Sequence, residues 1–189
     1  MATPQRSGMS GEEYLAWEAN QECKYEYLAG EIFAMVGASD RHVTIVGNLV
    51  AIIRTALRGT TRRVYAFQMK LRVEAVDAWF YPDVMVTCDP ADHQRDMDKT
   101  APALIIEVLS PSTEAFDRGG KFAAYRTLPS LSEYLLIDPH SGRLELYRRN
   151  PENQWVLHTP QGDTPLELSS VELSLDRATV FEDAQPGKV

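Results

Sequence analysis

The sequence predicts a mixed α/β protein, in which helices flank a central mixed sheet and a helix and a hairpin stand at the N-terminal end. Apolar residues recur at helical spacing after residue 40, an unbroken apolar run covers residues 104–109, and short strand-like segments fill residues 63–87 and 133–149. The chain has 189 residues, of which 44% are hydrophobic, and this size suits one domain. We therefore expect a single domain over residues 1–189, with its core at about 10–183 and a flexible tail at 184–189.

A short helix and a hairpin are expected first. Ser10 is followed three residues later by Glu13, and this capping box predicts a helix from there to about Asn20. The pair Ala29-Gly30 then lies between two strand-like segments, which predicts a β-hairpin.

The next expected helix is buried on two sides, because its apolar residues between Ile45 and Leu57 cover more than one face. Ser39 or Asp40 can cap its start, and Gly59 can end it.

The rest of the chain is expected to be mostly strands. Residues 63–73 alternate in the way of one long or bent strand, whereas residues 104–109 are apolar throughout, as is typical of a central strand buried on both faces. One further helix is expected up to about Leu128, although Gly119-Gly120 weaken it by about 1 kcal/mol each, so that it can start as late as Asp117. The other expected strands are 77–81, 84–87, 133–138, 143–149 and a short one near Trp155.

Composition limits the function classes. Asp and Glu outnumber Lys and Arg by 27 to 19, so the molecule as a whole repels a phosphate backbone and any nucleic-acid contact must be local. Cys23 and Cys88 are far apart and indicate neither a disulfide framework nor a zinc site. The first twelve residues lack the order of a signal peptide and no apolar run has membrane-spanning length, so we expect a cytoplasmic protein without a membrane partner.

Two acids stand where a strand ordinarily carries none. Asp83 opens an apolar strand, and Glu107 lies in the middle of the most apolar run of the chain. Burying an unpaired carboxylate is costly, and a divalent cation such as Mg²⁺ or Mn²⁺ compensates it, since one or two carboxylates are its ordinary ligands. The alternative is that each acid pairs with a base such as Lys70, Arg72 or Lys121 and serves the fold alone.

These acids also carry a family resemblance. Pro82-Asp83 followed by Glu107 resembles the PD-(D/E)xK nuclease motif, and longer segments are similar to the Uma-two family of restriction endonucleases. The similar segments, within a resemblance that runs from about residue 10 to 183, are 25–31, 81–84, 106–113, 117–121 and 133–139. The resemblance implies a restriction-endonuclease-like core and a metal-dependent nuclease, acting on nucleic acid and on DNA in particular, with Mg²⁺ or Mn²⁺ held by Asp83 and Glu107.

The lysine of that motif is missing from its usual place. It ordinarily stands two residues after the Glu, but Leu109 occupies this position and can neither donate a proton nor orient a water. Lys121 is the expected substitute, because a side chain from the start of the following helix can reach back over the strand. Its alternative is an exposed partner of Asp117, four residues earlier. Lys70 is the reserve candidate and is also expected to bind substrate.

Three more residues are candidates for the site. Glu31 begins a strand that can lie beside the two acids, and we expect it to be a further catalytic acid. Glu26 fits better as a solvent-facing acid of the hairpin. His42 is expected to contact substrate, although a lone His at a helix start is more often a local hydrogen-bonding residue.

Two alternatives to a nuclease stay open. Leu109 and the net charge of −8 favour a binding module that keeps the nuclease fold without its chemistry, and the charge also suits a metal-dependent phosphodiesterase for a smaller substrate. We expect a homodimer, because the two-sided helix needs cover and two-strand cutting suits a two-fold pair. The one basic run of note is either a phosphate contact or a solvated helix end, and consists of Arg54, Arg58, Arg62 and Arg63.

Overall fold

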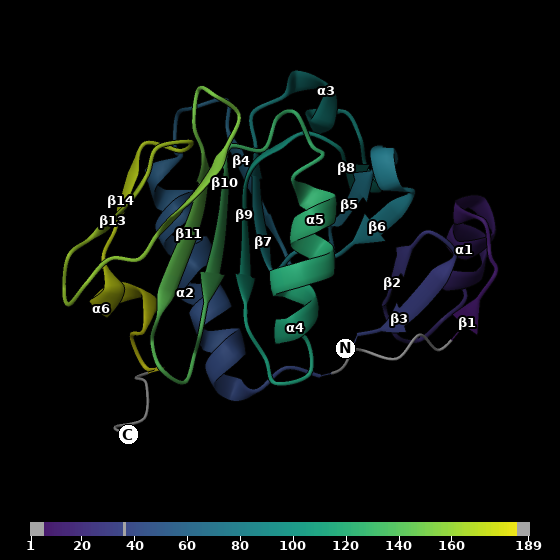
Figure 1. Cartoon of the computed structure of the whole chain (residues 1–189), viewed down its shortest axis with the longest axis horizontal. Coiled ribbons are helices and arrows are strands. Elements are labelled where there is room, and N and C mark those ends of the chain that lie inside the picture. Colours follow the sequence, from purple (N-terminus) through teal and green to yellow (C-terminus); the bar gives the residue numbers. More distant parts are fainter. Residues whose placement is uncertain (1–5, 36, 185–189) are drawn as a thin grey trace.

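The computed structural model describes residues 6–35 and 37–184, which form two six-stranded sheets and one two-stranded sheet with helices around them (Figure 1). The first sheet contains β1 (Arg6–Ser7), β2 (Tyr25–Leu28), β3 (Glu31–Ala34), β5 (Lys70–Val73), β6 (Ala78–Phe80) and β8 (Asp98–Lys99), in the order β1-β3-β2-β6-β5-β8. The second sheet contains β4 (Arg63–Ala66), β7 (Val84–Thr87), β9 (Pro102–Val108), β10 (Glu133–Ile137), β11 (Leu144–Arg149) and β12 (Trp155–His158), in the order β12-β11-β10-β9-β7-β4.

The second sheet is mixed, because β9 runs antiparallel to β7 and parallel to β10. This arrangement confirms the expected mixed α/β class, and it makes the two acid-bearing strands, β7 and β9, neighbours. The first sheet, which is built around the hairpin of β2 and β3, was not expected as a separate sheet.

Helices cover the two faces of the second sheet. On one face α2 (Asp40–Ala56) packs through Leu49 in a core that contains Ile106 of β9. On the other lies a helix built from α4 (Glu114–Phe116), a π-helical turn η2 (Asp117–Lys121) and α5 (Phe122–Tyr125), whose Tyr125 shares a core with Ile105 (Figure 1). Since side chains alternate along a strand, Glu107 faces the same side as Ile105, toward this second helix.

The N-terminal elements form as their sequence signals predict. In α1 (Gly11–Glu18), the Glu13 amide donates to Ser10 Oγ (3.2 Å) and the Ser10 amide donates to Glu13 Oε2 (2.8 Å), which is the expected capping box. Ala29 and Gly30 both have positive φ, as a two-residue turn between β2 and β3 requires. Ser39 caps α2 by accepting a hydrogen bond from the amide of His42 (3.3 Å).

Other expectations on the elements are wrong. Residues 63–73 form two strands, β4 and β5, in different sheets, because the chain leaves the extended conformation at Phe67, whose φ is +64°. The loop after β7 contains α3 (Pro90–His93) and β8, and a 3₁₀ turn, η1 (Glu74–Val76), follows β5. The helix after β9 begins at Glu114, before the latest expected start at Asp117, but it ends at Tyr125 rather than at about Leu128.

The C-terminal segment covers the second side of α2. It consists of β13 (Leu166–Leu168), β14 (Leu173–Leu175) and α6 (Arg177–Val180), which the sequence analysis did not identify. Asn48 of α2 donates hydrogen bonds to the carbonyls of Val180 (3.1 Å) and Glu182 (2.8 Å). The helix is therefore buried on two sides as expected, but this chain supplies the cover that was expected from a second copy. Ala184, expected in a flexible tail, is 5% exposed, and residues 185–189 lie outside the described residues.

Candidate active site

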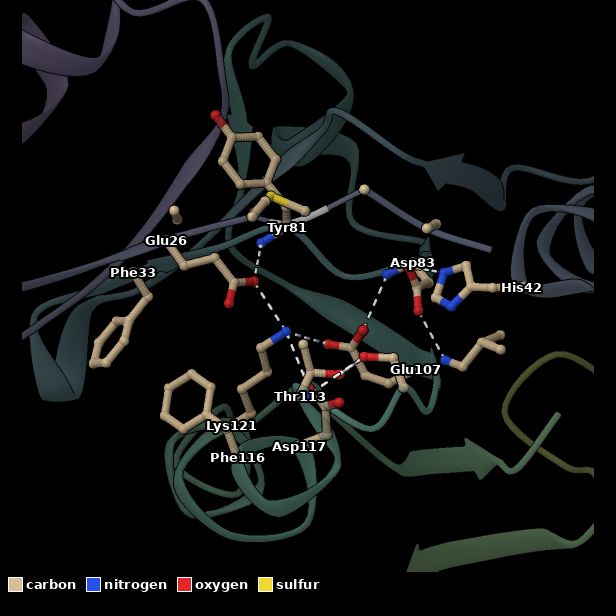
Figure 2. A pocket seen from close by; sticks show the side chains of 16 residues that line it. Glu26, Phe33, His42, Tyr81, Asp83, Glu107, Thr113, Phe116, Asp117 and Lys121 are labelled. Carbon is tan, nitrogen blue, oxygen red and sulfur yellow. Dashed lines mark hydrogen bonds and ion pairs between the residues drawn. The ribbon is translucent and has the colours of Figure 1, made fainter. Parts of the chain in front are cut away.

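A pocket of about 130 Å³ lies between the hairpin of β2 and β3 and the end of the second sheet where β9 ends and β7 begins (Figure 2). Four carboxylates from separate segments line it, together with one lysine and one histidine. These side chains are Glu26, Asp83, Glu107, Asp117, Lys121 and His42.

The two expected acids are adjacent. Pairing of Val84 with Ile106 brings Asp83 opposite Glu107, and the backbone N–H of Asp83 donates to Glu107 Oε2 (3.2 Å). Both oxygens of the Asp83 carboxylate have a partner. Oδ1 lies 3.0 Å from His42 Nε2, and Oδ2 accepts a hydrogen bond from the backbone N–H of Val108 (2.8 Å). Burial, the largest single effect, lowers the pKa of His42, but the hydrogen bond to Asp83, the charge of Asp83 and the nearby Asp117 together raise this pKa above its ordinary value.

Glu107 is a buried carboxylate, only 3% exposed. Its Oε1 accepts hydrogen bonds from Lys121 Nζ (3.3 Å) and from the Tyr125 hydroxyl (2.9 Å). Burial raises the pKa of Glu107 well above its ordinary value; the Lys121 ammonium opposes this rise, and the nearby carboxylates of Asp117 and Asp83 add to it.

Lys121 lies where the sequence analysis expected it to reach, beside Glu107. Its buried Nζ also forms ion pairs with Glu26 (3.0 Å) and Asp117 (3.2 Å), so three carboxylates surround it, as Figure 2 shows. Burial alone would lower the pKa of this ammonium, but Glu107, Glu26 and Asp117 together raise it well above its ordinary value. Lys121 therefore carries a positive charge at neutral pH. The pairing with Asp117 that stood as its alternative is also present, but it is buried rather than exposed.

Glu26 is a site residue that the sequence analysis assigned to solvent. It is only 6% exposed, and besides its pair with Lys121 its Oε1 accepts from the backbone N–H of Tyr81 (3.0 Å). Burial raises the pKa of Glu26, and Lys121 opposes that rise. The available signal was its place between two aromatic residues, Tyr25 and Tyr27, in a short strand-like segment.

Two other candidates lie elsewhere. Glu31 is exposed and does not line the pocket, because the hairpin pairs Glu26 with Phe33 at its pocket end and Leu28 with Glu31 at its turn end. The expectation that Glu31 joins the acids is therefore wrong.

Lys70, expected as a substrate-binding residue, does not line the pocket either. Its Nζ forms an ion pair with the buried Glu18 (2.6 Å), and this pair links β5 to α1.

The basic run of Arg54, Arg58, Arg62 and Arg63 does not line the pocket either. Arg54 belongs to the end of α2 opposite to His42, roughly 18 Å along the helix axis at about 1.5 Å per residue, and Arg62 pairs with Glu172 (2.7 Å).

Two adjacent carboxylates of the pocket suit a divalent cation that takes its other ligands from water and substrate. Among the described residues, no group of three or more His, Cys, Asp or Glu side chains is arranged to hold a metal. Asp83 and Glu107 offer two adjacent carboxylates, and Mg²⁺ in proteins commonly takes one or two carboxylates with waters and substrate phosphate as its other ligands. The four carboxylates of the pocket also outnumber its lysine and histidine, and a bound cation reduces this excess of negative charge.

The fold and the site together define a mixed α/β protein of the restriction-endonuclease-like class. The chain belongs to the Uma2 family, whose model is described as "Putative restriction endonuclease" and matches residues 12–179. It is 41% identical over 166 residues to the uncharacterized protein slr1290 of Synechocystis sp., covering 88% of this chain and 87% of that protein. It is 36% identical over 168 residues to sll1609 of the same organism, covering 87% of this chain and 95% of that protein.

A solved structure confirms the fold. A crystal structure described as "a putative nuclease belonging to DUF820", from Anabaena variabilis, matches with a TM-score of 0.76 over 94% of this chain and 100% of that chain. The sequences are 19% identical, so this match concerns the fold alone. No helix of the described residues is long and apolar enough to cross a membrane.

Proposed function

We propose that this protein is a metal-dependent endonuclease that hydrolyses phosphodiester bonds of DNA, with Mg²⁺ or Mn²⁺ held by Asp83 and Glu107. One observation carries the proposal: the Lys121 ammonium lies 3.3 Å from Glu107 Oε1, in the pocket that also presents Asp83. Lys121 comes from a helix rather than from the strand, and its position beside the two acids supports a role for it as the lysine of the motif. The family description and the name of the structural neighbour support the nuclease part of this proposal.

The side chains of the pocket have different roles in the proposed reaction. When bound, the cation polarises the phosphodiester and lowers the pKa of a bound water. Lys121, charged and fixed by three carboxylates, stabilises the negative charge that develops on the phosphate. His42 and the Val108 amide hold the Asp83 carboxylate in one orientation, as partners of a metal ligand commonly do.

A cleavage assay tests the proposal. Duplex DNA, single-stranded DNA, RNA and a chromogenic phosphodiester are each incubated with the protein in Mg²⁺, Mn²⁺ or a chelator. We expect cleavage of DNA only with metal, and a loss of about 10²–10³-fold in rate for Lys121→Met, the scale for removing one charge-stabilising donor. Lys99→Met is the matched control, because Lys99 is also buried but binds backbone carbonyls outside the pocket.

Each outcome of the cleavage assay distinguishes the proposed nuclease from one of its alternatives. No cleavage of any substrate and no metal binding would favour a binding module, and cleavage of the chromogenic ester alone would favour a smaller substrate. Equal rates for Lys121→Met and the parent would remove Lys121 from the mechanism.

We also propose a homodimer, which two-strand cutting alone now supports, since the C-terminal segment covers α2. A monomeric mass by light scattering at micromolar concentration would contradict it.

A further inference from the structure

Arg41 lies at the start of α2, directly before the pocket residue His42. Its Nη1 lies 3.4 Å from Nδ1 of His140, which belongs to the loop between β10 and β11. Two basic side chains from distant segments therefore contact each other. The positive charge of Arg41 has no ion-pair partner in the described part of the chain.

This basic pair lies at the same end of the second sheet as the pocket. Since β10 runs parallel to β9, with Ile137 opposite Val108, the loop after β10 leaves the sheet where the pocket lies. Figure 1 shows the start of α2, the end of β9 and the β10–β11 connection together at that end. Arg41 follows the chain next to His42, which contacts Asp83, and consecutive Cα atoms are about 3.8 Å apart. A phosphate beside one held at Asp83 is therefore within reach of the long Arg41 side chain.

The pocket itself offers little positive charge to the rest of a nucleic-acid strand. Among the described residues that line it, Lys121 is the only lysine or arginine, and three carboxylates surround it. Nucleic-acid-binding proteins obtain much of their affinity from lysine and arginine contacts to phosphates, whereas this chain has a net charge of −8. The phosphates on either side of the cleaved bond therefore need cationic contacts outside the pocket.

Arg41 and His140 together present donors that suit a phosphate. A guanidinium is planar, remains charged and presents its N–H groups in a fork that matches phosphate oxygens. Because a guanidinium only donates, His140 Nδ1 accepts in their contact, and the hydrogen of the neutral ring is then on Nε2. This Nε2–H group is a second donor for the same anion.

The loop that carries His140 is held in one conformation by its own hydrogen bonds. The Asp138 carboxylate accepts from the backbone N–H groups of His140 (2.8 Å) and Ser141 (3.2 Å) and from the Ser141 hydroxyl (2.5 Å). Arg177 Nη2 donates to the carbonyl of Ser141 (3.4 Å). A loop held in this way loses little conformational freedom when it binds a ligand.

We infer that Arg41 and His140 bind a phosphate of the nucleic-acid strand, next to the phosphate that lies at Asp83 and Glu107. This inference rests on the proposed function and adds to it a phosphate-binding site outside the catalytic pocket. A contact of this kind fixes the position of the strand and reads no base sequence.

The test measures how binding depends on salt. A labelled form of the nucleic acid that the parent cleaves is titrated with protein and followed by fluorescence anisotropy, between about 50 and 200 mM salt. Ca²⁺ replaces Mg²⁺, because it takes the same oxygen ligands. Arg41→Gln should reduce the slope of the logarithm of the association constant against that of the salt concentration by about 0.7–0.9, the contribution of one phosphate contact. This slope corresponds to a loss of about four- to sixfold in affinity near 150 mM salt.

Cleavage in Mg²⁺ gives a second readout. The kcat of Arg41→Gln at saturating substrate should stay close to that of the parent, because a contact to a neighbouring phosphate is made equally in the ground state and the transition state. The variant should also melt with the parent, because the contact between Arg41 and His140 is exposed.

Arg54→Gln is the matched control. Arg54 is an arginine of the same helix, roughly 20 Å from Arg41 along the axis at about 1.5 Å per residue, and it does not line the pocket. Its loss should leave the salt slope unchanged. Arg41→Lys should retain most of the slope, since lysine keeps the charge, and His140→Ala should weaken binding because it removes the second donor.

A parent-like slope in Arg41→Gln, or equal changes in Arg41→Gln and Arg54→Gln, would overturn the inference and leave the proposed function standing. If Arg41→Gln melts below the parent, His140→Ala decides, and an affinity equal to that of the parent would overturn the inference. A parent protein that neither binds nor cleaves any nucleic acid would overturn both the inference and the proposed function.

Discussion

Lys121 can be both buried and charged because carboxylates from three segments surround it. Moving an ammonium out of water costs several kcal/mol unless opposite charges and hydrogen bonds compensate it, and Glu26, Glu107 and Asp117 do so here. The group as a whole is then negative, with three carboxylates for one ammonium. Burial raises the pKa of Glu107, the neighbouring carboxylates add to this rise, and their excess of negative charge favours uptake of a further cation.

Asp83→Asn tests whether the acid pair exists for a metal. The change weakens the pair with His42, which is partly exposed, but it also relieves repulsion toward Glu107, and an asparagine oxygen can still accept from Val108. We expect the metal-free variant to be within about 1 kcal/mol of the parent at neutral pH, the scale of a partly exposed pair. The parent should melt at higher temperature in excess Mn²⁺ than in chelator, and the variant should lose this shift.

Asp92→Asn is the matched control for that experiment. Asp92 is a buried acid outside the pocket, and its carboxylate accepts from the Thr87 hydroxyl (2.9 Å) and the amides of Thr100 (2.8 Å) and Ala101 (2.9 Å). Its loss should reduce stability by about 1.5–3 kcal/mol, the value for hydrogen bonds to a charged group, and leave the Mn²⁺ shift intact. If Asp83→Asn behaves like Asp92→Asn in thermal melts, Asp83 serves the fold.

The sequence allowed part of this site to be predicted. Asp83 and Glu107 were identifiable because each interrupts an apolar strand. Lys121 was a candidate because a side chain at the start of the following helix can reach back over that strand, and the family resemblance favoured it over an exposed partner of Asp117. Glu26 and Asp117 could not be identified in the same way, since their partner, Lys121, becomes their neighbour only when the hairpin and the helix pack together.

At the scale of elements, the helix after β9 contains a π-helical turn at the lysine. The turn spans Asp117–Lys121 and includes two glycines of different surroundings. A Cβ on Gly120 would lie 2.5 Å from the ring of Phe116, whereas one on Gly119 would meet no atom within 4 Å. Gly120 therefore permits the close approach of Phe116, which lines the pocket.

These two glycines make a matched pair of variants. Gly120→Ala should lower the free energy of unfolding by about 1–3 kcal/mol, because the ring of Phe116 must move in a packed core. Gly119→Ala should raise it by up to about 1 kcal/mol, because alanine favours helix and has open space there. Urea denaturation measures both. Equal effects of the two changes would contradict the close packing at Gly120.

The elements that the sequence did not predict share a physical cause. Residues 64–67 are apolar or aromatic throughout and residues 67–73 alternate, so the pattern suits one strand and does not show the reversal at Phe67, which depends on the two sheets that β4 and β5 join. The strands β13 and β14 have three residues each, which is too short for a periodic signal. Long or strongly apolar elements, such as α2 and β9, were predictable because their pattern repeats several times.

At the scale of the whole molecule, the C-terminal segment is part of the main core. Phe181 is 1% exposed and belongs to the core on the α2 face of the second sheet. Phe181→Ala should lower the free energy of unfolding by about 3–5 kcal/mol, as for a phenylalanine lost from a core. The Mn²⁺-dependent shift should survive, because Phe181 does not line the pocket. Urea denaturation measures this loss, with Val156→Ala as the control, because Val156 is an exposed residue of β12. A loss no larger than that of the control would show that the segment is peripheral.

In this chain the lysine beside Glu107 comes from a helix, and this affects how proteins with the same arrangement can be recognised. Leu109 occupies the strand position where the motif has its lysine, and it is 3% exposed in the core beneath the helix. A text search that demands lysine at this position would pass over this chain. A search in three dimensions, which asks only for an ammonium within hydrogen-bonding reach of the strand glutamate, would retrieve it, since Lys121 satisfies that condition at 3.3 Å.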